Sequence, residues 1–133
     1  MTVAHESCQV VATVPARVGL CADVTTALLG TGVKIVGTTM YDTPHGAQIF
    51  VMADDNDLAA AALERLGASV RIVPTVVLEI PDELGALDEA MHRISEAGIN
   101  IDSMYMTTSG GDTATVLLHT SDDERVVEFF QAQ

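Results

Sequence analysis

Basic side chains are scarce in this sequence. Six Lys and Arg residues stand against 19 Asp and Glu residues in a chain of 133, which gives a formal net charge of −13. A surface of this sign repels nucleic-acid phosphates and anionic lipid headgroups, so we expect no nucleic-acid partner and no membrane partner. Aromatic residues make up only 4% of the chain and tryptophan is absent, so platforms for base stacking are missing.

Cysteines and long apolar runs are also few. Cys8 and Cys21 are too few for a zinc site built on thiolates, and we expect both to be reduced and at least partly buried, with a disulfide between them as the alternative. No apolar run approaches the ~20 residues of a membrane span. The segment Met1 to Ser7 lacks the basic and apolar regions of a signal peptide, which favours a cytoplasmic location.

Catalytic motifs are missing as well. His5, His45, His92 and His119 are scattered without metal-ligand spacing, and no nucleophile elbow, P-loop or dinucleotide fingerprint occurs. Cys21 falls on the apolar stripe of an expected helix and has no activating neighbour. The sequence therefore predicts a protein that is not an enzyme, with no metal and no cofactor.

What the sequence does contain is an internal repeat. A shift of 66 residues without a gap superposes turn residues and apolar positions on residues of the same kind. The matched pairs include Pro15 and Pro81, Gly19 and Gly85, Gly32 and Gly98, Ile35 and Ile101, and Met40 and Met106. Two glycine pairs and a proline pair in one register indicate two copies of one structural unit.

Each copy predicts the same order of elements. Alternating and β-branched runs predict strands, and apolar residues spaced by three and four predict helices. The expected strands are 10–14, 33–40, 48–52 and 69–73 in the first copy and 76–80, 99–106 and 114–119 in the second. The expected helices end at Gly32 and Gly98, and a second helix in each copy covers 58–66 and 124–131, with Asp57 and either Asp122 or Asp123 as N-caps.

This order predicts an α+β protein with two ferredoxin-like βαββαβ repeats, antiparallel sheets and helices on one face. The expected domains are residues 1–75 and 76–133, and the second lacks its last strand. Met1 to Gln9 lies in the register of that missing strand. We therefore weigh two hypotheses: this segment fills the empty edge, in its own chain or in a partner, or the edge stays open and favours dimerisation by strand pairing.

Two short runs resemble a known family. Pro81–Leu87, followed by Glu96–Ile101, is similar to the ACT domain pattern, in which a polar loop ends a strand and a glycine opens the next helix. The runs Pro15–Leu20 and Thr31–Ile35 resemble the same pattern more loosely. The resemblance covers about Val10 to Gln131, so it implies a tandem ACT protein.

The resemblance implies a function and a site. ACT domains are regulatory modules that bind amino acids, typically where two such domains meet. The ligand is then expected near the loop between the first strand and first helix of a repeat. The positions that match are Asp82, Leu84, Gly85, Ala86 and Asn100 in the second repeat and Arg17, Val18 and Gly19 in the first. Lys34 stands where the first repeat would need the asparagine, which puts an equivalent second site in doubt.

The chemistry of these residues fits a zwitterion. The amino terminus of a helix receives a carboxylate, Asp82 can pair with an ammonium group, and Asn100 can bond to either. Purely structural roles remain open beside these: Gly85 can serve only a tight turn, Asp82 and Asn100 can simply face solvent, and Arg17 can pair with a nearby acid.

Three functions follow. The first is a regulatory protein, expected as a homodimer, that binds a free amino acid and shifts between quaternary states. The second is a ligand-free interaction or regulatory subunit of a separately encoded metabolic enzyme. The third, ranked last, is a small ferredoxin-like enzyme.

Overall fold

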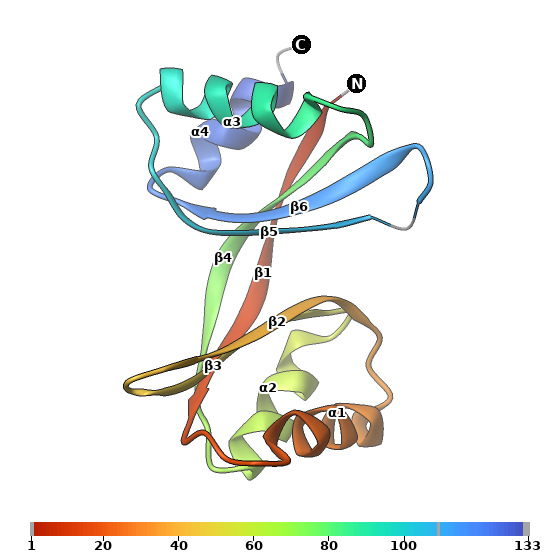
Figure 1. Cartoon of the computed structure of the whole chain (residues 1–133), viewed down its shortest axis with the longest axis vertical. Helices are drawn as coiled ribbons and strands as arrows, with labels where there is room; N and C mark the ends of the chain where they lie inside the picture. The colour runs from red at the N-terminus through yellow and green to blue at the C-terminus, as the bar shows by residue number, and fades with distance from the viewer. Residues whose placement is uncertain (1, 109, 132–133) are drawn as a thin grey trace. The chain divides into compact units, whose positions relative to one another are not determined.

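The computed structural model describes residues 2–108 and 110–131, which form two compact units (Figure 1). Unit 1 consists of Met1–Ser7 and Pro74–Gln133, and unit 2 consists of Cys8–Val73. The elements are β1 (Val3–Val14), α1 (Leu20–Thr31), β2 (Ile35–Thr43), β3 (Gly46–Ala53), α2 (Asn56–Arg65), β4 (Ser69–Pro81), α3 (Ala86–Glu96), β5 (Ile101–Thr108), β6 (Thr113–Thr120) and α4 (Asp123–Gln131). The strands β1 and β4 each contribute residues to both units.

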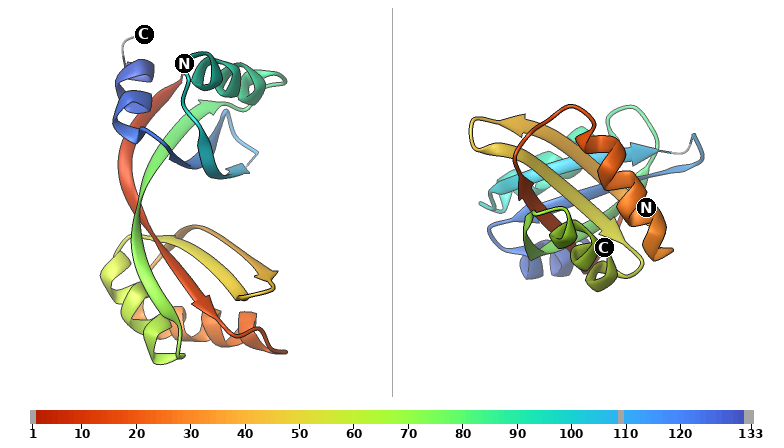
Figure 2. Two further views of the ribbon diagram at one scale, coloured as in Figure 1. Left: turned by 90° about the vertical axis from the view of Figure 1, so that its left-hand side faces the viewer. Right: turned by 90° about the horizontal axis from the view of Figure 1, so that it is seen from below.

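Unit 2 is a sheet with two helices on one face (Figure 2). Its strands lie in the order β2-β3-β1, followed by the first part of β4. The strand β3 pairs antiparallel with β1 and with β2, and Val10 lies opposite Val51. The helices α1 and α2 pack Val24, Leu28 and Leu63 against the sheet residues Val10 and Val51. All five side chains are buried, so the helix faces and the sheet face form one core.

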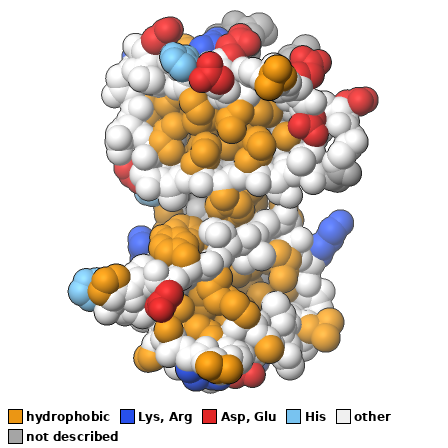
Figure 3. All heavy atoms as spheres, viewed as in Figure 1, with side chains coloured by type: hydrophobic (Ala, Val, Ile, Leu, Met, Phe, Trp, Pro, Cys, Tyr) orange, Lys and Arg blue, Asp and Glu red, His pale blue; other side chains and the backbone are white. Residues whose placement is uncertain are grey.

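Unit 1 repeats this arrangement with strands from both ends of the chain. The order is β5-β6-β4, followed by the first part of β1. The strand β6 pairs antiparallel with β4 and with β5. On the face seen in Figure 3, hydrophobic side chains lie between the helices and the sheet of this unit, and acidic side chains gather on the helix side. Both units therefore show the α+β arrangement that the repeat predicts: antiparallel strands with helices on one face.

The amino-terminal segment is part of unit 1. Its residues Val3 to Ser7 form the beginning of β1, although their sequence has low strand propensity. Ala4 is 1% exposed and belongs to the unit 1 core. The side-chain amide of Gln131 donates to the Ala4 carbonyl oxygen at 3.3 Å. Val3 to Ser7 thus belongs to the same unit as Pro74–Gln133 of the same chain, and β1 lies next to β4 in the strand order.

The helix ends show which local expectations hold. Gly32 and Gly98 both have φ of 76°, the left-handed conformation expected after a helix, so these two predictions are confirmed. Asp122 accepts a hydrogen bond from the Arg125 amide at 3.2 Å, as an N-cap should. The expected N-cap Asp57 is wrong, because Asp55 accepts from the Leu58 amide at 3.1 Å and the helix begins at Asn56.

The expectation that the cysteines are buried is also wrong. Cys8 and Cys21 are free and exposed. The helix α1 instead buries Leu20, Val24 and Leu28, four residues apart, against the sheet. Cys21 is turned about 100° away from that stripe, and its Sγ lies 3.0 Å from the Sδ of Met40.

Candidate functional site at the strand-to-helix loops

The loop that leads from β1 into α1 is built around one glycine. Gly19 has φ of 88° and ψ of −2°, a left-handed conformation that side chains other than glycine rarely adopt. The Leu20 amide donates to the Arg17 carbonyl oxygen at 3.3 Å. The Asp23 amide donates to the Gly19 carbonyl oxygen at 3.0 Å and begins the helical ladder. The chain therefore turns from strand to helix within a few residues.

The loop between β4 and α3 has the same construction. Gly85 has φ of 87° and ψ of −12°. The Ala86 amide donates to the Glu83 carbonyl oxygen at 3.2 Å, and the Glu89 amide donates to the Gly85 carbonyl oxygen at 3.0 Å. No side chain caps the amino terminus of α1 or α3 in the part of the chain that is described. The positive end of each helix is therefore available to an anion.

A pocket of about 760 Å³ lies at the loop of unit 2. It is lined by Ala16, Arg17, Val18, Gly19, Leu20, Cys21, Ala22, Met40, Tyr41, Asp42 and Ala47. All three first-repeat candidates, Arg17, Val18 and Gly19, therefore meet in one place. The Arg17 guanidinium forms an ion pair with Asp23, which lies in the first turn of α1. This pairing reduces the charge that Arg17 can offer to a carboxylate.

The loop of unit 1 is organised differently around Asp82. The Thr108 hydroxyl donates to the Asp82 carboxylate at 2.5 Å, and the Asp82 amide donates to the Asp112 carbonyl oxygen at 2.9 Å. The repeat places Ala16 and Asp42 at the positions of Asp82 and Thr108, and this pair cannot form the same bond. A carboxylate-to-hydroxyl bond thus joins the loop to the end of β5 in unit 1 only.

A second pocket, of about 460 Å³, lies beside the amino terminus of α3. It is lined by Thr2, Pro81, Glu83, Leu84, Gly85, Ala86, Glu89, Ala90, Arg93 and Phe130. Three second-repeat candidates, Leu84, Gly85 and Ala86, line it, whereas Asp82 and Asn100 do not. The sequence-based candidates omit Glu89 and Arg93. Their spacing of four residues on one helix is the signal that could have suggested them.

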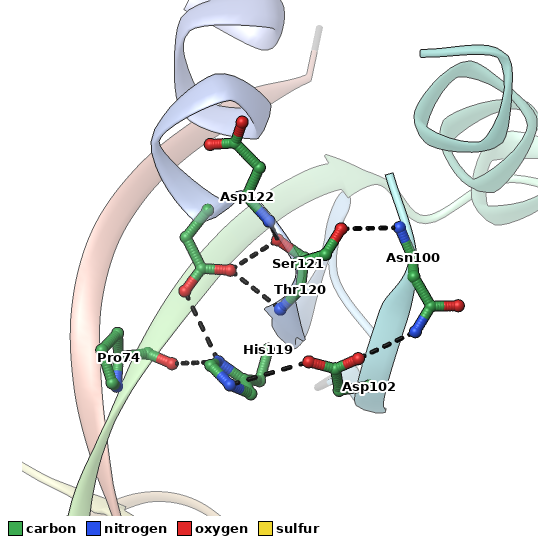
Figure 4. A network of polar contacts seen from close by, with 8 residues as sticks. Pro74, Asn100, Asp102, His119, Thr120, Ser121 and Asp122 are labelled. Atoms are coloured by element: carbon green, nitrogen blue, oxygen red, sulfur yellow. Dashed lines mark hydrogen bonds and ion pairs between the residues drawn. The ribbon is translucent and has the colours of Figure 1, made fainter. Parts of the chain in front are cut away.

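Asn100 belongs to a network of polar contacts (Figure 4). Its backbone amide donates to the Ser121 hydroxyl at 2.9 Å, and its side-chain amide donates to the Asp102 carboxylate at 2.8 Å. The other Asp102 oxygen lies 3.8 Å from Nε2 of His119, and Nδ1 of His119 lies 2.8 Å from the Pro74 carbonyl oxygen. Asn100 therefore has partners within the protein, and it lies directly before β5.

Two titratable groups, His92 and Tyr105, have a pKa above the ordinary value for their residue type. A hydrogen bond to the Asp88 carbonyl oxygen, with the nearby Asp88 carboxylate, raises the pKa of the exposed His92. Burial raises the pKa of Tyr105 to about 12. Neither residue lines the two pockets described above. Within residues 2–108 and 110–131, no group of three His, Cys, Asp or Glu side chains could hold a metal ion.

Replacing the loop glycines is expected to destabilise the fold. Gly19→Ala and Gly85→Ala should each cost about 1–2 kcal/mol, because alanine must adopt the left-handed conformation. An added Cβ at Gly85 meets no atom within 4 Å, so that cost is conformational. Gly30→Ala, in the last turn of α1, is the control: an added Cβ meets no atom within 4 Å and its φ is not left-handed, so the change should stabilise the protein by about 0.4–1 kcal/mol. Urea unfolding of the three variants measures this, and equal midpoints would contradict it.

Comparison with known proteins establishes the fold. No family model matches the sequence, and no curated protein does. Among solved structures, protein BT0572 from Bacteroides thetaiotaomicron has a TM-score of 0.86 at 21% identity, over 97% of this chain and 89% of that one. The ligand-free regulatory subunit of aspartate kinase from Thermus thermophilus has a TM-score of 0.73 at 16% identity, over 98% and 95% of the two chains.

A third structure supports the same fold. The regulatory subunit of aspartate kinase from Thermus flavus has a TM-score of 0.68 at 17% identity, over 97% of this chain and 95% of that one. The chain therefore shares the fold of these regulatory subunits. Among the described helices, none has the length and apolar character needed to cross a membrane.

Proposed function

We propose that this chain is a non-catalytic regulatory protein that binds a free amino acid. The observation that carries the proposal is the repeated strand-to-helix loop, which leaves two helix amino termini uncapped beside pockets. A likeness in fold to regulatory subunits of aspartate kinase supports a regulatory role. The absence of a catalytic motif in the sequence is compatible with the same role.

The loops suit a small zwitterion. The positive end of a helix attracts a carboxylate, and each charge-assisted hydrogen bond contributes roughly 1.5–3 kcal/mol. Acidic side chains close to both loops, Asp42 in one pocket and Glu83 in the other, can attract an ammonium group. After ordering and desolvation costs, two or three such bonds give modest affinity, which suits a sensor of metabolite concentration.

The exposed tips of the loops favour assembly with a further surface. Val18 is 101% exposed and Leu84 is 106% exposed, and the repeat places them at equivalent positions. Burying such aliphatic side chains stabilises a complex by roughly 1.5–3 kcal/mol each. A homodimer and a separately encoded metabolic enzyme are the partners that we propose. If no ligand binds, these tips favour the second function, a ligand-free interaction subunit.

Thermal unfolding in the presence of each of the twenty amino acids tests the proposal. A ligand at about 100 times its dissociation constant stabilises the folded protein by about 2.7 kcal/mol, which should raise the midpoint by about 10 °C for a chain of this size. We expect one amino acid, or a small group of similar ones, to produce this shift. If none of the twenty raises the midpoint at 10 mM, the ligand-free function replaces this one.

A further inference from the structure

We propose that the pocket beside α3 in unit 1 is a zwitterion site in which Arg93 receives the carboxylate of an amino acid and Glu89 receives its ammonium group. This inference rests on the proposed function and assigns it to one pocket. The loop residues Leu84, Gly85 and Ala86 form one wall of that pocket. Arg93 comes from the third turn of α3, and Phe130 comes from α4.

Arg93 is held in a defined orientation by two aromatic rings. Its guanidinium carbon lies 4.8 Å from the centre of the Phe129 ring and 5.1 Å from the centre of the Phe130 ring. The two rings meet edge to face, with centres 5.3 Å apart and planes at 81°. A planar guanidinium packed on aromatic faces loses little further freedom when it binds a carboxylate, so its fork of donors is pre-organised.

Arg93 also has no ion-pair partner within residues 2–108 and 110–131, in a protein with 19 acidic residues. The other two arginines with described side-chain bonds are engaged: Arg17 pairs with Asp23, and Arg125 donates to the Ala97 carbonyl oxygen. A guanidinium that lines a pocket and lacks such a partner can donate two parallel hydrogen bonds to a ligand carboxylate.

The charges of the pocket complement a zwitterion rather than a simple anion. Glu83 and Glu89 line it together with Arg93, so the lining has one positive and two negative side chains. A plain carboxylate would be repelled by the two glutamates, and a plain amine would leave Arg93 unpaired. Pro81, Ala90 and Phe130 supply apolar wall for the side chain of the ligand, in a volume of about 460 Å³ that a single amino acid fits.

Unit 2 does not repeat this arrangement. The 66-residue shift places Ala27 at the position of Arg93 and Glu64 at the position of Phe130. Neither the guanidinium nor its aromatic support is therefore available there. The site is expected once per chain, with a stoichiometry of one amino acid per polypeptide.

Calorimetric titration of the full chain with each of the twenty amino acids tests the site. The amino acid that binds wild-type protein best is then titrated into Arg93→Met, Arg93→Lys and Glu89→Gln. We expect at least a tenfold loss of affinity in Arg93→Met, a smaller loss in Arg93→Lys, and about a tenfold loss in Glu89→Gln. The carboxylic acid and the amine that each lack one charged group of that amino acid, such as propionate and ethylamine for alanine, should bind at least tenfold more weakly.

The control is Arg71→Met, which removes the same charge from an exposed position on β4 in unit 2 and should bind like wild type. If wild type binds an amino acid and Arg93→Met binds it equally well, the assignment of the ligand to this pocket is wrong, while the proposed function stands. If wild type binds none, the proposed function itself fails. Should Arg93→Met not fold, judged by its thermal midpoint, Arg93→Lys and Glu89→Gln carry the same test.

Discussion

Replacing Ala4 by aspartate is expected to destabilise unit 1 by about 3–5 kcal/mol. Ala4 is 1% exposed and lies in the same core as Ile99 and Phe130. A carboxylate at this position would be buried without a cationic partner, and either its charge or its protonation costs free energy. Urea unfolding followed by circular dichroism should show a clearly lower midpoint, and amide hydrogen exchange should show lost protection in α3 and α4.

The neighbouring residue supplies the control for this substitution. His5 is exposed and lies in the same strand, so His5→Asp introduces a carboxylate on the solvent side. We expect its free energy of unfolding to stay within about 0.5 kcal/mol of wild type. Equal midpoints for Ala4→Asp and His5→Asp would mean that the segment Val3 to Ser7 does not pack into the core of unit 1 in solution.

Truncating Leu28 to alanine is expected to cost about 2–5 kcal/mol in unit 2, because it removes buried methyl groups and leaves a cavity. Leu28 is 2% exposed and packs in the core with Val24 and Leu63. The next residue is the matched control, since Leu29 is 81% exposed and undergoes the same chemical change. Leu29→Ala should change the free energy of unfolding by less than about 0.5 kcal/mol. A similar loss in both variants would place α1 in a different rotation from the one described.

Much of the fold can be predicted from the sequence because the residues that end helices and form turns are set by local conformation. Gly19 and Gly85 are needed for left-handed loop conformations, and Gly32 and Gly98 are needed after helix ends, so each leaves a mark at a fixed place. These glycines recur after 66 residues, and this recurrence identifies two similar units. The antiparallel sheets and the helices on one face follow from the order of strands and helices alone.

Other parts of the fold depend on tertiary contacts that no local pattern records. Val3 to Ser7 has a weak strand sequence, and it is a strand because Ala4 packs into a core built mostly from residues after Pro74. The buried stripe of α1 consists of Leu20, Val24 and Leu28 and leaves out Cys21, although Leu20 and Cys21 both fit helical spacing with Val24. The packing of α1 against the sheet, and not the spacing in the sequence, decides which of the two side chains is buried.

The residues of the pocket beside α3 also differ in how far they can be predicted from the sequence. Leu84, Gly85 and Ala86 could be named from the sequence because they belong to one loop motif. Arg93 and Phe130 line the same pocket but come from two helices, 37 positions apart in the chain. Only the packing of α4 beside α3 brings them together. Asp82 belongs to the motif too, but it does not line that pocket, and one of its carboxylate oxygens accepts from the Thr108 hydroxyl.

The division of β1 between the two units has a consequence for synthesis on the ribosome. Unit 2 is one uninterrupted stretch, Cys8–Val73, so it can fold as soon as that stretch has emerged. Val3 to Ser7 emerges earlier but must remain without its core until β6 and α4 have been translated. Val3 to Ser7 are thus made before unit 2 but pack after it, and until then they are exposed to proteases and chaperones.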